Sequence, residues 1–470
     1  MICEGFFFDP NERLTGKFGD PMPHIHWRSK FSRLALGAVF VIGCAEAVIC
    51  AAGDWPQWRG PRRDDVSTET GLLKDWPTGG PPLVWETKGL GGASSGYSTV
   101  SISNGKIFAT GSFPSPPGDA TEKPEPKTVV KPGPKSKAIP IDETTSVIAL
   151  DLTGKILWTT QVGPTTPMDS PEWTGARGAP TVDGDRVYSL ADSGDLVCLA
   201  VNDGKAIWRV NLKKDLRGAV GQWAYTESPV IEGDKLICCP GGSLGTLAVL
   251  DKKTGAVLWR SKGLTDGASY SSLVPADING VHQYVVMTPG SVAGVGTDGS
   301  LLWKIARASF TYAICTPVVK DNLVFVTGRG ACNAYKIEGA GSAMKAIPLF
   351  ESKDMKVLHG GVIVIGDDVF GCNDPGLLTC MSLKDGSVVW KDRSIGKGSL
   401  TFADDRLYFR AEATGDVALI EASHMGYKEH GVLKQPHRSK RSAWAHPVIS
   451  GGKLYLRDQD TLLCYDVKAK

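Results

Sequence analysis

The stretch LDKKTGAVLW, Leu250 to Trp259, recurs in degenerate form along most of the chain. Its constant feature is a glycine four residues before a tryptophan, found at Gly154/Trp158, Gly204/Trp208, Gly255/Trp259, Gly299/Trp303 and Gly386/Trp390. Composition alone predicts roughly 1.5 such pairs in 470 residues, so the excess and its regular spacing indicate a structural repeat. In each copy an apolar strand ends in a turn such as KTG or TDG, and a second apolar strand ends at the tryptophan. This pattern predicts a β-hairpin.

Another hairpin precedes each of these units. The run TPVVKDNLVFVTG, Thr316 to Gly328, has a small or proline-containing entry, an apolar strand, a polar turn and a further strand. Matching runs begin near Ser98, Ala179, Ser228, Ser272, Gly361, Leu400 and His446. Two hairpins give four strands per unit, and the alternation of apolar and polar positions fits sheets packed face to face. We therefore predict an all-β fold, an eight-bladed β-propeller of four-stranded antiparallel blades.

The two ends of the repeat array predict how the ring closes. The last unit holds three strands before Lys470, whereas PLVWETKG, Pro82 to Gly89, supplies a strand whose Trp85 matches the other outer-strand tryptophans. We expect this N-terminal strand to pair in the last blade and close the ring. Phe350 and the segment Tyr427 to Val432 are expected to lie in the outer strands of the two units without tryptophan.

The domain boundaries follow from this count. Residues 1–52 are predicted to be a leader, 53–81 an N-terminal extension and 82–470 the propeller, with a Pro- and Lys-rich insertion at 113–143. The insertion has no periodicity and is typical of an exposed loop between the second and third strands of the first blade. The protein is expected to be a monomer.

The leader has the order of a secretory signal peptide. A basic cluster at 28–33 precedes an apolar run from Leu34 to Cys44, and small residues follow up to Ala52. The 21 residues before Met22 fit no part of such a signal, so we take Met22 as a candidate start. The chain is therefore predicted to be exported to the periplasm or cell envelope.

Three alternatives remain for the fate of the leader. Cleavage after Ala47 or Ala52 would release a soluble protein, and the run Val41-Ile42-Gly43-Cys44 would place a lipid anchor on Cys44. An uncleaved membrane anchor is disfavoured because Glu46 would place a carboxylate near the bilayer.

Charge and cysteine content exclude some classes of function. The formal net charge of +2 gives no electrostatic signature for nucleic acid or for anionic lipid, so nucleic acid is not an expected partner. No CxxC motif occurs among the 11 cysteines, and several lie in strand-like runs where a cysteine behaves as a small apolar residue. We expect buried free thiols. The redox state of the vicinal pair Cys238-Cys239 stays open.

Units of the form AxD-x-x-TG-x-x-x-W in an exported eight-bladed array resemble the pyrroloquinoline-quinone (PQQ) repeat superfamily. The resemblance covers essentially the whole chain after the leader. One branch of that superfamily contains quinoprotein alcohol dehydrogenases, and another contains non-catalytic propellers such as the outer-membrane β-barrel assembly lipoprotein. The segments WPQWRGP, Trp55 to Pro61, and LRDQDTLLCYDVK, Leu456 to Lys468, look most like PQQ-like propellers of the planctomycete type.

The entries to the innermost strands are expected to line one mouth of the central channel. The residues concerned are Tyr97, Arg177, Trp223, Tyr225, Glu227, Tyr270, Tyr312, His359, Lys397, Trp444 and His446. Aromatic walls with a few polar groups are typical of a ligand site. The alternative is that the aromatic residues cap the channel while the charges pair with one another.

Basic residues near this mouth favour an anionic ligand. Arg410 and Arg457 are added to the ligand-binding set, and Arg438 and Arg441 lie in the basic segment just before Trp444. An acidic glycan or another carboxylate would suit such a site, unless these are solvated loop charges. The expected partner is an envelope protein or a small anionic ligand, held by a non-catalytic binding or scaffold propeller with no catalytic residues and no metal.

The resemblance also implies an alternative, a PQQ- and calcium-dependent alcohol or sugar dehydrogenase. That quinoprotein pattern asks for Ca²⁺ held by Glu, Asn and Asp oxygens, a catalytic Asp, a Trp under the quinone and a vicinal disulfide over it. Glu227 and Trp223 are plausible in position, and Asp458 is the candidate base. No Asn or Asp accompanies Glu227 in the strand entries, and Cys238-Cys239 lies in a predicted strand. We therefore expect no cofactor, with PQQ and Ca²⁺ as the alternative.

Overall fold

The computed structural model describes residues 53–470 except 95, 116–140, 169 and 308–311. The chain divides into two units, residues 1–47 and 48–470, and every described residue belongs to the second. The predictions for the leader, including Met22 and the anchor at Cys44, therefore fall outside the described residues. So does most of the insertion, which lies between a strand ending at Pro114 and a strand beginning at Glu143.

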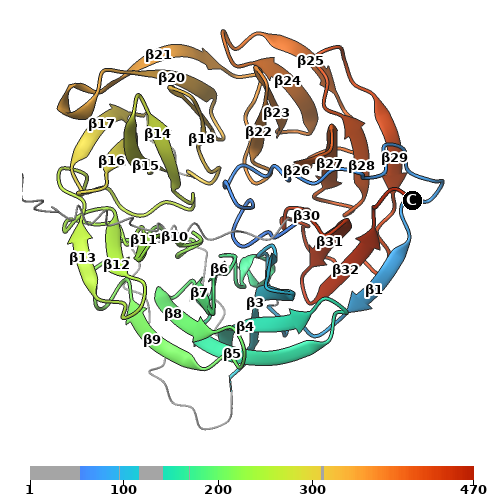
Figure 1. Cartoon of the computed structure of the whole chain (residues 1–470), viewed down its shortest axis with the longest axis horizontal. Helices are drawn as coiled ribbons and strands as arrows, with labels where there is room; N and C mark the ends of the chain where they lie inside the picture. The colour runs from blue at the N-terminus through green and yellow to red at the C-terminus, as the bar shows by residue number, and fades with distance from the viewer. Residues whose placement is uncertain (1–52, 95, 116–140, 169, 308–311) are drawn as a thin grey trace, which may run out of the picture. The chain divides into compact units, whose positions relative to one another are not determined.

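Eight four-stranded antiparallel sheets stand in a ring around a central channel (Figure 1), which confirms the predicted propeller. Blades are numbered here in chain order, and each is given from its innermost strand outward. Blade 1 holds β2 (Ser101–Ser103), β3 (Lys106–Pro114), β4 (Glu143–Asp151) and β5 (Ile156–Pro164); blade 2 holds β6 (Thr181–Asp183), β7 (Arg186–Leu190), β8 (Asp195–Ala200) and β9 (Ala206–Asn211); blade 3 holds β10 (Val230–Glu232), β11 (Lys235–Cys238), β12 (Ala248–Asp251) and β13 (Val257–Arg260); blade 4 holds β14 (Val274–Ile278), β15 (Val281–Met287), β16 (Ser291–Gly296) and β17 (Leu301–Ala306).

The second half of the ring repeats the same plan. Blade 5 holds β18 (Val318–Lys320), β19 (Leu323–Thr327), β20 (Cys332–Glu338) and β21 (Lys345–Ser352); blade 6 holds β22 (Val362–Ile365), β23 (Asp368–Asn373), β24 (Leu377–Ser382) and β25 (Val388–Asp392); blade 7 holds β26 (Gly398–Ala403), β27 (Arg406–Ala411), β28 (Val417–Glu421) and β29 (Glu429–Leu433); blade 8 holds β30 (Val448–Ser450), β31 (Lys453–Asp458), β32 (Thr461–Asp466) and β1 (Leu83–Thr87). Two single-turn 3₁₀ helices, η1 (Pro171–Trp173) and η2 (Gly341–Ala343), lie in connections. No helix among the described residues has the length and apolar character needed to cross a bilayer.

The fourth strand of blade 8 comes from the N-terminal side of the chain. β1 pairs antiparallel with β32, with Trp85 opposite Cys464 and Thr87 opposite Leu462. Phe350 lies in β21, and the predicted segment ending at Val432 contains most of β29. All eight outer positions are thus occupied by strands that the repeat pattern located.

The Gly-Trp repeat is explained by contacts between successive blades. Gly255 has φ +75°, and a Cβ there would lie 2.8 Å from the indole of Trp208 in the preceding blade. The same indole donates from Nε1 to the carbonyl oxygen of Lys252 at 3.0 Å. Only a glycine lets the turn of one blade approach the tryptophan of the previous blade this closely. The motif therefore locks neighbouring blades together.

The hydrophobic core lies between adjacent sheets. One cluster joins Tyr188 and Leu196 of blade 2 to Leu236 and Val249 of blade 3, all of them buried. Around the channel, hydroxyl groups cross the same seams, as where Thr181 Oγ1 donates to the carbonyl oxygen of Pro229 at 2.6 Å. This repeated burial against both neighbours is what a closed ring of sheets requires.

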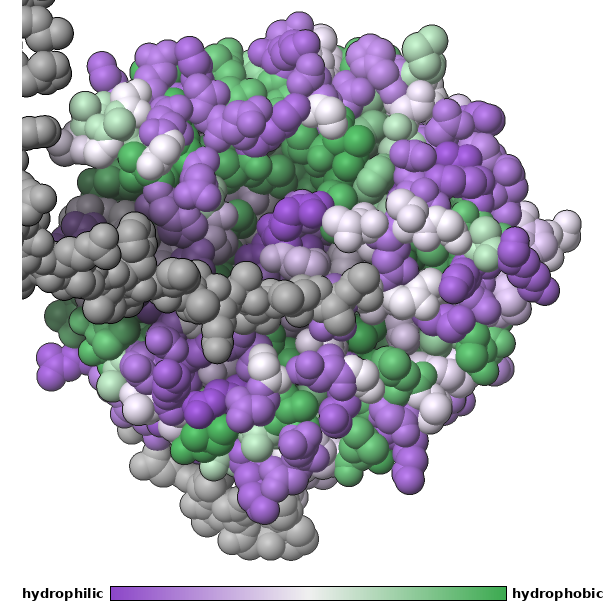
Figure 2. All heavy atoms as spheres, viewed as in Figure 1, coloured by the Kyte–Doolittle hydropathy of each residue, from purple (hydrophilic) through white to green (hydrophobic). Residues whose placement is uncertain are grey.

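The N-terminal extension forms an element that the repeat pattern did not foresee. Residues 54–76, called the strap here, enter the channel beside blade 1 and leave across blade 7 (Figure 1). Trp55 pairs with Ile102 of β2, Val66 pairs with Phe402 of β26, and the backbone N–H of Trp76 donates to the carbonyl oxygen of His430. On the face drawn in Figure 2 the surface is hollowed near its centre, and hydrophilic and hydrophobic patches alternate around it.

Candidate functional site

The strap fills one end of the channel with a buried ion pair. Arg59 Nε lies 2.5 Å from Asp65 Oδ2, and both side chains are almost fully excluded from solvent. Arg59 also donates to the carbonyl oxygen of Val362 at 2.5 Å, and Asp65 Oδ2 lies 3.1 Å from His446 Nδ1. Burial acts to raise the pKa of Asp65, but Arg59 and His446 lower it more. The carboxylate is therefore held ionised between two basic groups, as a buried charge requires.

A second strap arginine reaches blade 3. Arg63 donates to the carbonyl oxygens of Ser228 at 2.9 Å and Pro229 at 3.4 Å. Its positive charge acts on Glu227, whose Oε1 accepts from the backbone N–H of Cys239 at 2.5 Å. Burial raises the pKa of Glu227 to about 7 despite these contacts. Glu227 is thus a buried carboxyl beside the plugged channel, 2% exposed, and it does not line an open mouth.

The opposite end of the inner strands carries a continuous chain of aromatic contacts. The ring of Trp444 stacks on His359 at 4.3 Å and lies 4.5 Å from Tyr97. The Arg177 guanidinium sits 5.8 Å above Tyr97 and 5.9 Å above Trp223. These residues come from the entry loops of blades 6, 8, 1, 2 and 3, so the structure brings together five of the residues that symmetry placed at this mouth. We call it the aromatic mouth.

Further residues extend the aromatic mouth on the blade 3 side. Trp173 of η1 meets Trp223 edge to face at 5.3 Å and is 41% exposed. The hydroxyl of Tyr270 accepts from the backbone N–H of Trp223 at 3.3 Å. Farther round the ring, Arg329 stands 5.8 Å over the ring of Tyr312. The mouth therefore offers half-buried aromatic faces next to guanidinium groups.

Two arginines at the mouth are held by backbone carbonyls. Arg177 donates to the carbonyl oxygens of Trp173 and Trp223. Arg441 donates to those of Ser94 at 2.9 Å and Ala93 at 2.8 Å. Neither forms an ion pair with any carboxylate that the structure describes, and burial lowers the pKa of Arg177. Their positive charge is fixed in place and not neutralised by a direct partner, which suits an anionic group.

Lys397 and His359 have other surroundings. Lys397 Nζ pairs with Asp374 at 2.9 Å and Glu412 at 3.3 Å, so this predicted ligand residue is already neutralised. Burial lowers the pKa of His359 to about 4, which leaves a neutral ring at pH 7. The His359 Nδ1 and Trp444 Nε1 atoms are buried without a protein partner among the described residues. Both can serve a bound polar group.

Several residues that the sequence placed in the site are interior side chains. Tyr225 is 2% exposed and donates from its hydroxyl to the carbonyl oxygen of Pro240 at 3.0 Å, and His446 is 2% exposed under the strap. Arg410 donates to the carbonyl oxygens of Ala445 and Arg457 within blade 8. These groups cannot touch a ligand at the surface of the mouth.

Arg410 and Arg457 have a shared reason for their burial. They occupy equivalent positions, four residues after the start of β27 and of β31. Arg457 Nη1 donates to Ser98 Oγ of blade 1 at 2.7 Å, as Arg410 donates to blade 8. Side chains alternate along a strand, and this position points into the seam between blades. The expectation of ligand binding is therefore corrected to bracing of the ring where it closes.

The quinoprotein alternative requires metal ligands, a free catalytic base and a vicinal disulfide, which the described residues do not provide. No group of three or more His, Cys, Asp or Glu side chains that could hold a metal ion comes together in residues 53–470, the undescribed segments aside. The proposed base Asp458 pairs with Arg438 at 2.5 Å and accepts from Ser439 Oγ at 2.6 Å. Cys238 and Cys239 are buried free thiols whose pKa burial raises, with Cys238 in β11. The donor set does not fit a calcium-bound quinone.

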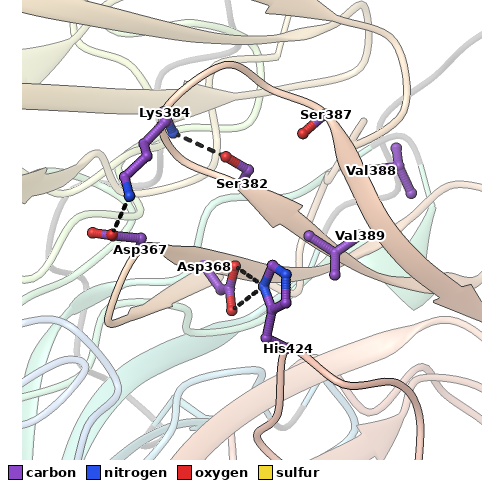
Figure 3. A pocket seen from close by; sticks show the side chains of 8 residues that line it. All are labelled: Asp367, Asp368, Ser382, Lys384, Ser387, Val388, Val389 and His424. Atoms are coloured by element: carbon purple, nitrogen blue, oxygen red, sulfur yellow. Dashed lines mark hydrogen bonds and ion pairs between the residues drawn. The ribbon is translucent and has the colours of Figure 1, made fainter.

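A separate cavity of about 600 Å³ lies between the hairpin turns of blade 6 and the loop after β28 of blade 7 (Figure 3). Its charged groups are paired with one another: Lys384 with Asp367 at 2.8 Å, and His424 with Asp368 at 3.0 Å. Ser382, Ser387, Val388 and Val389 complete the wall. Because these side chains already bond to one another, this cavity offers a ligand little specific attraction.

Sequence reasoning missed Trp173 and the three strap residues Arg59, Arg63 and Asp65. Trp173 stands in a connection and outside every repeat, and its signal is a large aromatic residue in a loop four residues before Arg177. The strap carries a denser signal, with two tryptophans and three arginines between Trp55 and Arg63. Such a density in a short extension indicates a docked segment.

Comparison with known proteins places these features in a wider group. Residues 143–392 match the protein family described as "Outer membrane protein assembly factor BamB". None of the curated proteins matches the sequence.

Three solved structures show the same fold. BamB from Moraxella catarrhalis has a TM-score of 0.50 and 15% identity, and the match covers 71% of this chain and 95% of that one. The quinohemoprotein alcohol dehydrogenase from Comamonas testosteroni has a TM-score of 0.57 and 13% identity, covering 89% and 81%. The computationally designed Ika8 protein has a TM-score of 0.52 and 13% identity, covering 81% and 100%. At these identities the likeness concerns the fold alone.

Proposed function

This chain belongs to the family of the outer membrane protein assembly factor BamB, and from that premise we propose that it is an exported, non-catalytic scaffold of the cell envelope. In this proposal the aromatic mouth binds a partner. The partner is an envelope protein with an acidic surface segment, and a small anionic ligand is the alternative occupant. The leader and the family membership support the envelope location.

One observation carries the proposal. Arg177 stands over Tyr97 and Trp223 and donates its hydrogen bonds to backbone carbonyl oxygens. A guanidinium fixed over aromatic rings and without a carboxylate partner is ready to receive one from another molecule. Interfaces are enriched in tryptophan, tyrosine and arginine for the same physical reasons.

Binding of a defined acidic probe tests the mouth. We would titrate the full chain into fluorescein-labelled hexaglutamate and follow anisotropy, with trigalacturonate as competitor. Arg177→Ala and Trp223→Ala should each weaken binding at least about tenfold with little change in Tm, because both groups face solvent in part. Arg62→Ala removes an exposed arginine at the other end of the channel and should bind like the wild type. Equal affinity in all three variants would count against the mouth.

The location has its own test. Cell fractionation should recover the chain with the envelope, and Cys44→Ala should release it to a soluble fraction if Cys44 carries a lipid. Recovery from the cytoplasm would contradict export.

The dehydrogenase alternative predicts a different result. A quinoprotein would bind added PQQ in the presence of millimolar Ca²⁺, gain a quinone absorbance and oxidise an alcohol with a dye as acceptor. The scaffold proposal expects neither saturable PQQ binding nor turnover, since Glu227 and Asp458 already accept hydrogen bonds from other groups of the protein.

A further inference from the structure

The innermost strand of each blade has one edge that faces the channel. In β2 the middle residue, Ile102, both donates to and accepts from the backbone of Trp55. Ile102 is the residue before the last ladder pair of its hairpin, Ser103 with Lys106. The N–H and C=O of this position therefore point away from β3 and into the channel.

Two other blades show the same rule. Val182 stands before the last ladder pair of β6 and donates to the carbonyl oxygen of Pro56. Phe402 stands before the last pair of β26, donates to Asp65 O and accepts from Ser67 N. The strap is thus an extended segment that adds to three inner edges at one repeated position.

The equivalent residues in blades 4 and 5 are Asp277 and Val319. Asp277 precedes the last pair of β14, Ile278 with Val281, and Val319 precedes the last pair of β18, Lys320 with Leu323. Neither residue has a backbone bond to the strap, although residues 53–81 are described in full. Both line a cavity of about 310 Å³ between the strap and these two strands.

We propose that this cavity, called the β14/β18 groove, binds an extended segment of a partner protein through main-chain bonds to Asp277 of blade 4 and Val319 of blade 5, one residue per blade as in the strap. The groove is a site distinct from the aromatic mouth, because it lies at the end of the inner strands where the strap enters. Its full lining is Arg62, Arg63, Asp64, Val274, Pro275, Ala276, Asp277, Pro317, Val318, Val319 and Asp321.

The lining fixes the chemistry of the segment. Val274, Val318 and Pro317 are apolar and largely buried, so they suit small aliphatic side chains. Asp277 is 78% exposed at the rim, where its Oδ1 lies 2.8 Å from His282 Nδ1 and its Oδ2 has no partner among the described residues. Asp321 is exposed too, and within the described residues it forms no ion pair. A lysine or arginine in the bound segment would face these two carboxylates, as charge complementarity across an interface requires.

The position of the groove favours a single extended segment of a partner protein as its occupant and disfavours a second copy of this chain. The edges of β14 and β18 stand inside the ring, where the outer strand of another propeller cannot reach them. The strap demonstrates the form that does fit, which is a single extended chain using main-chain bonds for affinity and side-chain pockets for specificity.

A short peptide tests the proposal on the full chain. The probe is fluorescein-labelled acetyl-KVTVKV-amide, measured by anisotropy, with a second copy of the peptide N-methylated at alternate residues so that it cannot add to a strand edge. We expect saturable binding of the first peptide and at least about tenfold weaker binding of the second. This comparison leaves the protein unaltered.

Variants of the protein locate the site. Asp277→Asn with Asp321→Asn should weaken binding of the lysine peptide about tenfold and leave the neutral peptide acetyl-TVTVTV-amide unchanged. Asp185→Asn with Asp234→Asn, which removes exposed turn carboxylates from blades 2 and 3, is the matched control. The mouth variant Arg177→Ala should bind the peptide like the wild type.

Three results would overturn the proposal. They are equal binding of the methylated and unmethylated peptides, equal loss in both aspartate double variants, and no binding at millimolar peptide. A chain that sediments as a dimer and no longer binds the peptide would assign the groove to a second copy and refute it as well.

Discussion

The two ends of the channel use the same residue types in opposite ways. At the strap end Arg59 is buried and paired with Asp65 at 2.5 Å, so its charge is neutralised inside the protein. At the aromatic mouth Arg177 and Arg441 donate to carbonyl oxygens and keep their charge for another molecule. The difference teaches that burial separates an arginine that stabilises the ring, such as Arg59, from the partly exposed Arg177 and Arg441, which can receive a carboxylate from another molecule.

Removing Arg59 should have the largest effect on stability. Arg59→Ala leaves Asp65 buried beside one remaining basic group, His446, and breaking a buried pair in this way costs about 3–5 kcal/mol of unfolding free energy. Urea unfolding followed by tryptophan fluorescence measures it. Arg62→Ala breaks the exposed pair with Asp64 and should cost at most about 1 kcal/mol. Similar losses in both variants would erase the contrast between buried and exposed pairs.

The pH dependence of stability should depend on Glu227. Burial raises its pKa from 4.5 to about 7, so between these values the folded chain holds a proton that the unfolded chain releases. Folding then takes up a proton, and stability falls as pH rises through this window.

Glu227→Gln mimics the protonated carboxyl and abolishes that fall. Relative to the wild type, the unfolding free energy of the variant should rise by on the order of 3 kcal/mol between pH 4.5 and pH 8. The change in urea midpoint measures it. Glu172→Gln at an exposed site is the control and should track the wild type at every pH. A constant difference between Glu227→Gln and the wild type would show that Glu227 is ionised throughout.

Truncation of Trp444 should lower the unfolding free energy less than loss of the strap ion pair does. Its ring stacks on His359 and meets Tyr97 at a tilt but is half-buried, so Trp444→Ala should lower the unfolding free energy by about 1–2 kcal/mol. Thermal unfolding measures the change. A loss above about 3 kcal/mol would place Trp444 in the core and remove it from the binding surface.

The smallest effect is expected at Arg441. Arg441→Ala removes its bonds to carbonyl oxygens of neighbouring loops at a partly exposed site, and the net cost should be about 1 kcal/mol. The same variant should lower affinity for hexaglutamate, and raising the salt concentration should narrow its difference from the wild type. Unchanged affinity for hexaglutamate at low salt would show that Arg441 only links the loops.

The architecture could be predicted because the same sequence pattern recurs along the chain. Gly255 and its equivalents recur, and each repeat must form the same hairpin to pack on its neighbours. Symmetry then placed Arg177, Trp223, Tyr270 and His359 around one mouth, where their contacts now connect them. A repeat amplifies a weak local signal until it decides the fold.

The features that escaped prediction all lie outside the repeat or depend on the direction of a side chain. The strap has no period, so although its tryptophans and arginines indicate a docked segment, nothing in residues 54–66 says that they dock inside the channel. Arg410 and Arg457 look like ligand residues by type, yet one position along a strand decides between the seam and the surface. The burial of Tyr225 and His446 likewise depends on what covers them, which local sequence does not record.

Closure of the ring has a consequence for how the protein is made. Asp65 contacts His446 across 381 residues, and β1 pairs with β32, which is synthesised only after the other seven blades. During translation or export β1 therefore remains without a partner strand while seven blades form, whereas the strap already finds Ile102 in blade 1, and closing so long a loop is slow. A chain truncated before blade 8 would leave β1 with no strand to pair with. Proteases and chaperones could thus tell incomplete copies from complete ones by the N-terminus alone.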